Sequence, residues 1–193
     1  MADKYNKVKP KVHPITYGSI ALFLLIVLAV ILFVGPSDSE VLYNTYLYSG
    51  TALPETFTEE HPFVEIEYDN GFLGLSRGLE KTIEKDDVVL LFIGSETCEA
   101  CVNHIGAIQK YFYEEGVDDL IDTFWYFNPA DQLEEFEELT ANHPEIAQTT
   151  PQIILFKDGV VVATFTASAT DEQGINRTVK EFFTDDVLLA LSE

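Results

Sequence analysis

Residues 88–101 read VVLLFIGSETCEAC, and this stretch decides what the rest of the chain can be. Its first six residues are continuously apolar, which is typical of a strand buried on both faces. A short turn follows, and Cys98 and Cys101, the only two cysteines of the chain, then begin a helical pattern. Two thiols at this spacing on a strand-to-helix turn can close an intramolecular disulfide and reopen it by exchange.

Strand and helix patterns alternate on both sides of this stretch. We expect strands at residues 63–68, 88–93, 123–127, 152–156 and 160–166, and helices at 72–85, 98–115, 131–142 and 172–191, the last with a break near Thr184. Alternation of this kind predicts an α/β fold with parallel strands, while the Asp-Gly turn at 158–159 adds an antiparallel hairpin. The expected fold is a mixed sheet flanked by helices, with the cysteines beyond the carboxyl end of a central strand, where functional groups collect.

The N-terminal third has a different character. Residues 1–14 form a short basic tail, and residues 15–34 run without a charge for the length of a membrane-spanning helix. The lysines before the span predict a cytoplasmic N-terminus and an extracytoplasmic domain, hence a single-pass protein of the cell membrane. A cleaved signal peptide is the alternative, although the apolar run is long for one and no small-residue cleavage site follows. Residues 35–60 are expected to be a juxtamembrane linker with a short helix near 41–48, and residues 61–193 the domain.

The basic tail and the rest of the chain also differ in net charge. The chain has 33 acidic and 11 basic residues, a formal net charge of -22. Four lysines and one aspartate give the first 14 residues +3, and seven basic against 32 acidic residues give the rest -25. Because so acidic a body is repelled by phosphate backbones, we exclude nucleic acid as a partner.

The two cysteines are expected to differ in role. Cys98 lies where the free N–H groups of a helix N-terminus stabilise a thiolate, so it is the predicted nucleophile, and Cys101, one turn further, the resolving thiol. Glu96 and Glu99 oppose thiolate formation through their charge. His104 would offset them if it were protonated and reached the pair; the alternative is an exposed histidine without a role.

Two other uses of the pair are weaker. A zinc site would need Cys98, Cys101, His104 and a carboxylate, and no further cysteine exists to complete a common ligand set. A purely structural disulfide would close too short a loop to constrain the unfolded chain much. We therefore predict redox exchange, with no metal and no cofactor.

Three features resemble the thioredoxin family: the CEAC motif at 98–101 after a buried strand, Thr150-Pro151 before the next strand, and the segment PQIILFKDG at 151–159. The resemblance implies a thioredoxin-like sheet, a cis peptide bond at Pro151 facing the cysteines, and a backbone at Thr150 that binds extended substrate peptides.

The chain departs from the family's pattern at four places. Thr97 replaces a tryptophan, Phe92 a buried aspartate, Glu99-Ala100 a Gly-Pro pair, and Ala167 lies near a glycine position. The tethered architecture resembles membrane-anchored thioredoxin-like proteins of Gram-positive bacteria, including those called bacteriocin-transport accessory proteins.

These features predict a thiol-disulfide oxidoreductase outside the membrane that acts on protein thiols and disulfides, with a lean toward reduction or isomerisation and with a membrane redox protein as the recycling partner. The alternative is an accessory or binding protein without turnover, for example one that assists export of a secreted peptide.

Overall fold

The computed structural model describes residues 14–34, 37–71 and 76–192, without the side chains of residues 14 and 29–34. The chain divides into two units, one that ends at Ser37 and one that begins at Asp38. The first unit contains helix α1, Pro14–Val34, of 21 residues. Among the described residues, no helix combines the length and the apolar character that crossing a membrane requires. The membrane span at residues 15–34 stays a prediction, and of the basic tail predicted at 1–14, residues 1–13 lie outside the described residues.

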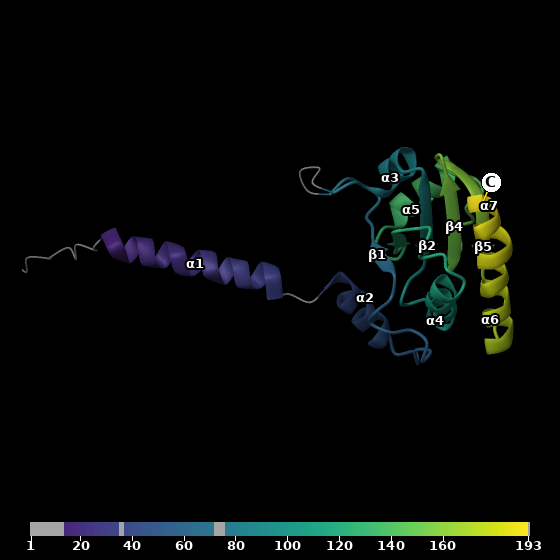
Figure 1. Cartoon of the computed structure of the whole chain (residues 1–193), viewed down its shortest axis with the longest axis horizontal. Coiled ribbons are helices and arrows are strands. Elements are labelled where there is room, and N and C mark those ends of the chain that lie inside the picture. Colours follow the sequence, from purple (N-terminus) through teal and green to yellow (C-terminus); the bar gives the residue numbers. More distant parts are fainter. Residues whose placement is uncertain (1–13, 35–36, 72–75, 193) are drawn as a thin grey trace, which may run out of the picture. The chain divides into compact units, whose positions relative to one another are not determined.

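Within the described residues of the second unit, five strands form one mixed sheet in the order β1-β3-β2-β4-β5 (Figure 1). Strands β1, β3 and β2 run parallel, while β4 and β5 are antiparallel to their neighbours. The bounds of the strands are Phe63–Glu65 (β1), Val88–Ile93 (β2), Phe124–Phe127 (β3), Gln152–Lys157 (β4) and Val160–Thr166 (β5). The α/β class and the mixed sheet predicted from the sequence are confirmed.

Helices cover both faces of the sheet. They are α2 (Asp38–Leu47), α3 (Leu79–Lys85), α4 (Glu99–Glu114), α5 (Leu133–Asn142), α6 (Glu172–Glu181), a π-helical turn (Phe182–Val187) and α7 (Leu188–Ser192). Side chains of α2, α4, α6 and the π-helical turn pack with one face of the sheet, and those of α3 and α5 pack with the other. The central strand β2 is therefore buried on both sides, as its apolar run predicts.

Two predicted helices differ from the structure. The helix expected over 72–85 begins only at Leu79; residues 72–75 lie outside the described residues, and residues 76–78 are not helical. The Leu79 N–H donates to the Glu67 carbonyl at 2.9 Å, and the N-cap residue Gly78 has an extended backbone, so the helix starts only at Leu79. At the C-terminus the expected break near Thr184 is a π-helical turn, so the chain stays helical through it.

The segment predicted as a linker contributes to the core of the domain. Helix α2 places Leu42 and Tyr46, one turn apart, against the sheet, and the Tyr46 side chain is 0% exposed. The connection from α2 to β1 adds the buried Phe57. The compact unit therefore begins at Asp38 rather than at residue 61, because two apolar residues at helical spacing suffice to dock a short helix.

Candidate active site at the cysteine pair

Strand β2 and helix α4 position the two cysteines. Cys98 is the N-cap residue of α4, and Cys101 lies in its first turn. A disulfide joins them, with their Cα atoms 5.2 Å apart. Cys98 is half-buried, whereas Cys101 is 0% exposed. Only Cys98 is thus open to a macromolecular partner, which is the asymmetry that a nucleophile and a resolving thiol require.

The Thr150–Pro151 peptide bond is cis, as the resemblance implies. Strand β4 follows it and pairs antiparallel with β2, with Gln152 opposite Ile93, so residue 150 reaches the level of the cysteines. The Thr150 carbonyl oxygen lies 3.8 Å from Cys98 Sγ. The structure therefore brings Thr150 and Pro151 to Cys98 and Cys101, although Thr150 follows Cys98 by 52 residues in the chain.

Two donors point at the Cys98 sulfur. The backbone N–H of Cys101 donates to Cys98 Sγ at 3.2 Å, and the Thr150 hydroxyl donates to it at 3.4 Å. Both bonds strengthen when the sulfur carries a negative charge, because charge-assisted hydrogen bonds are stronger than neutral ones. The site can therefore stabilise a thiolate on Cys98 once the disulfide is reduced.

The turn before Cys98 is fixed by a polar network that ends on a carboxylate. Glu96 Oε2 accepts from Ser95 Oγ at 3.3 Å and from Asn128 Nδ2 at 3.2 Å, and the same amide nitrogen donates to Asp131 Oδ2 at 2.7 Å. Ser95 Oγ also bonds Thr97 Oγ1 at 2.8 Å. Asn128 thus joins Asp131 to Glu96, which lies two residues before Cys98.

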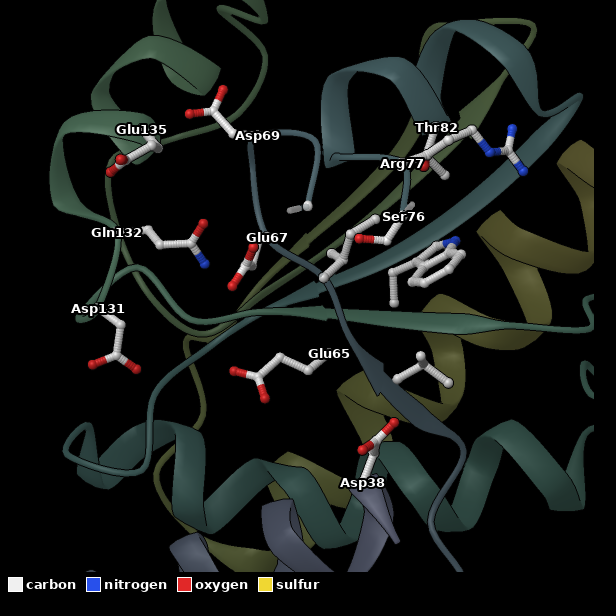
Figure 2. Close-up of a pocket in the computed structure, with 14 residues that line it drawn as sticks. Asp38, Glu65, Glu67, Asp69, Ser76, Arg77, Thr82, Asp131, Gln132 and Glu135 are labelled. Carbon is white, nitrogen blue, oxygen red and sulfur yellow. The ribbon is translucent and has the colours of Figure 1, made fainter. Parts of the chain in front are cut away.

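Asp131 also borders a hollow that further acids line (Figure 2). The carboxylates of Glu65, Glu67 and Asp131 surround one open space between strand β1 and the loop before α5. This hollow has a volume of about 920 Å³. Burial, followed by repulsion from Asp131 and other nearby acids, raises the pKa of Glu65. Glu96, two residues before Cys98, also acts on Glu65, and its own negative charge opposes a thiolate on Cys98.

The other predicted modulators lie in contrasting places. Glu99 is exposed in the first turn of α4. His104 is 1% exposed, so it is not the exposed histidine considered from the sequence. Its Nδ1 lies 2.7 Å from the Ala100 carbonyl oxygen. Burial lowers its pKa, although the bond to Ala100 acts in the opposite direction, so the ring is neutral near pH 7.

Uncharged side chains fill the core around Phe92. The Phe92 ring lies 5.7 Å from that of Tyr126, and the Tyr126 hydroxyl bonds that of Tyr46 at 3.2 Å. Burial raises the pKa of both tyrosines, so both hydroxyls stay neutral. Among the described residues, no group of three or more His, Cys, Asp and Glu side chains could hold a metal ion.

Sequence reasoning missed several of these residues. The sequence did not identify Asn128 as a site residue and left Tyr46 within the predicted linker, because their partners are distant in the chain. An asparagine directly after a buried strand was the one local signal for Asn128, since that end of a parallel strand borders the site.

No family model matches the chain, and no curated protein matches it. Among solved structures, it is similar to a putative oxidoreductase with a thioredoxin fold at 18% identity and a TM-score of 0.40, over 61% of this chain and 93% of the other. It is also similar to a point mutant of thioredoxin from Halobacterium salinarum, at 18% identity and a TM-score of 0.36, over 69% and 96%. The zinc-bound form of human ERp44 follows at 9% identity and a TM-score of 0.38, over 62% of this chain and 30% of the other. At such identities and scores we take the fold from the strand order and directions of the sheet itself.

Proposed function

We propose that this thioredoxin-like domain exchanges disulfides with protein substrates through Cys98 and Cys101. One observation carries the proposal: a half-buried Cys98 at a helix N-terminus accepts two hydrogen bonds, faces the cis Thr150–Pro151 bond and has a fully buried partner thiol. A structural disulfide needs neither a partly exposed cysteine nor donors aimed at its sulfur.

In the reducing direction, the Cys98 thiolate attacks one sulfur of a substrate disulfide. A mixed disulfide forms, and the other substrate sulfur leaves as a thiolate. Cys101 then gives its proton to that thiolate and attacks Cys98 Sγ, which breaks the mixed bond and releases the second substrate sulfur. The substrate gains two electrons and the pair loses them; oxidation is the same sequence reversed.

The charges around the pair favour the reducing direction. A thiolate on Cys98 is less stable with Glu96 and Glu99 next to it in the chain than in neutral surroundings, and a less stable dithiol form means a lower reduction potential. In a glutathione redox titration we expect a value nearer the roughly -270 mV of thioredoxin than the roughly -120 mV of the strongest protein oxidants. A value near the latter would reverse the assignment of direction.

We further propose that residues 15–34 anchor the protein in a membrane and that the domain lies outside it. The apolar, uncharged character of these residues and the lysines before them support this arrangement. A membrane redox protein would then recycle the pair. Protease protection in sealed membranes tests the topology: the domain should be digested from the outside only.

Trapping tests the exchange reaction directly. A Cys101→Ser variant should accumulate mixed disulfides on Cys98, since the resolving step is removed, and the captured proteins identify the substrates. A Cys98→Ser variant is the matched control and should trap far less. Equal trapping by both variants, or by neither, would contradict the proposal.

The second candidate is a binding module that uses the groove at Thr150 without turnover, for example in export of a peptide. The uncharged core at Phe92, where the thioredoxin pattern has a buried aspartate, favours it. Replacement of both cysteines by serine separates the two: a binding module keeps its cellular role, whereas an oxidoreductase loses it.

A further inference from the structure

The imidazole of His104 bonds to the peptide group between the two cysteines. A carbonyl oxygen only accepts hydrogen bonds, so the Nδ1 that lies 2.7 Å from the Ala100 oxygen carries the hydrogen. In the neutral ring Nε2 is then unprotonated, and it is buried without a hydrogen-bond partner among the residues that the structure describes. His104 is thus held as one tautomer by one contact.

The same peptide group acts at its other end on the redox sulfur. The carbonyl of Ala100 and the N–H of Cys101 belong to one peptide unit, and this N–H donates to Cys98 Sγ at 3.2 Å. A peptide unit that accepts a bond at its oxygen becomes a stronger donor at its N–H, because hydrogen bonds in series polarise one another. Two bonds through one peptide therefore link the imidazole to Cys98.

The setting of His104 preserves this effect. The ring is 1% exposed and lies 6.1 Å from the Phe165 ring of strand β5, so water does not compete strongly for Nδ1. In a medium of low polarity a hydrogen bond is electrostatically stronger than in water. The ring acts as a neutral donor, which is neither the protonated imidazole nor the exposed histidine without a role that the sequence analysis considered.

We propose that His104 is a positioning residue that stabilises the Cys98 thiolate through the Ala100–Cys101 peptide. It partly offsets the negative charges of Glu96 and Glu99 without placing a positive charge at the site. The proposal deepens the exchange reaction and rests on that proposed function for its biological meaning, while the effect on Cys98 is a chemical property that can be measured without a substrate.

Two replacements separate the bond from packing. His104→Leu keeps an apolar side chain and removes the donor. His104→Asn keeps a donor that can reach the carbonyl four residues earlier, as Asn176 does with the Glu172 carbonyl at 2.8 Å in this chain. Both are made together with Cys101→Ser, so that Cys98 is the only thiol.

The measurement is the rate at which iodoacetamide alkylates Cys98 at pH 7, divided by its plateau at alkaline pH, which gives the thiolate fraction. Relative to the Cys101→Ser parent, His104→Leu should lower this fraction about two- to fourfold, the effect of weakening a charge-assisted bond by a fraction of its strength. His104→Asn should stay close to the parent. No change in His104→Leu, or an equal loss in both variants, would overturn the proposal.

A second measurement uses the unmodified protein, in case His104→Leu does not fold. The ¹⁵N shifts of the histidine rings distinguish the two neutral tautomers. We expect the Nδ1–H tautomer for His104 in both the oxidised and the reduced protein; the Nε2–H tautomer would refute the coupling. If the alkylation result holds but trapping on Cys98 fails, the exchange function falls and the coupling stands.

Discussion

Replacing Thr150 by valine removes one donor from the Cys98 sulfur while it keeps the branched shape of the side chain. The hydroxyl donates to Sγ at 3.4 Å, and the residue is half-buried beside the cis bond. The bond favours the dithiol form because it is stronger to a thiolate than to a disulfide sulfur. We therefore expect the variant to be more reducing.

The magnitude follows from one charge-assisted bond. Such bonds contribute about 1.5–3 kcal/mol, and a long bond to sulfur belongs at the lower end. Part of this stabilisation by the hydrogen bond is also present in the disulfide form. The bond therefore stabilises the dithiol form by about 1–1.5 kcal/mol more than the disulfide form. For a two-electron couple about 1.4 kcal/mol corresponds to roughly 30 mV, so the potential should fall by roughly 20–30 mV.

A glutathione redox titration, read by alkylation and gel shift, measures the change. The full effect is expected at pH values where Cys98 is ionised, and it should fade as the pH falls and the thiol becomes protonated. Thr149→Val is the matched control, since Thr149 is exposed and makes no hydrogen bond to the pair within the described part of the chain. An unchanged or higher potential in Thr150→Val would refute a role for the hydroxyl in thiolate stabilisation.

Three further outcomes are expected. Glu96→Gln should raise the reduction potential by roughly 10–20 mV, since it removes a nearby negative charge. In the same titration, added salt should reduce the difference in potential between the variant and the native protein. A lower potential in the variant would contradict this expectation. Tyr126→Phe should lower the free energy of unfolding in urea by about 1–3 kcal/mol, because it leaves the Tyr46 hydroxyl buried without its partner. The double Tyr46→Phe, Tyr126→Phe variant should lose less stability. Equal losses in the two variants would show that the hydrogen bond contributes little. Burial lowers the pKa of His61, whose unfolded form takes up a proton near pH ~6.5, so the free energy of unfolding should be highest above that pH and decline below it. His61→Asn should show a smaller decline between about pH 7.5 and about pH 5.5, and an unchanged pH profile would exclude His61 as a cause.

The sequence predicted most accurately the elements whose structure depends on residues adjacent in the chain. The apolar run at 88–93 became strand β2 with its bounds unchanged, and Asp158-Gly159 became the hairpin turn, in which both residues have positive φ. Strand β1 is shorter than its alternating pattern, with pairing recorded only over Phe63–Glu65, because strand β3 offers few partner residues. The length of a strand is thus decided by its neighbour, which a pattern along one segment does not contain.

The sequence identified the main residues of the site but not the burial of their neighbours. Cys98, Cys101, Thr150 and Pro151 were identified by spacing and resemblance, and the structure brings them together. The burial of His104 was not predictable, because it depends on how strand β5 packs against α4. Exposure and tautomer are tertiary properties, and they decide what a histidine in a helix can do.

Trp125 determines what the intrinsic fluorescence of this protein reports. It is the only tryptophan of the chain, and it packs with the face of the sheet opposite α4, where it borders the acidic hollow. Its emission should change little when the cysteines are reduced, since the sheet separates it from them. It should respond instead to unfolding, so fluorescence reports on the integrity of the fold, while the redox state of the cysteines must be followed by chemical labelling.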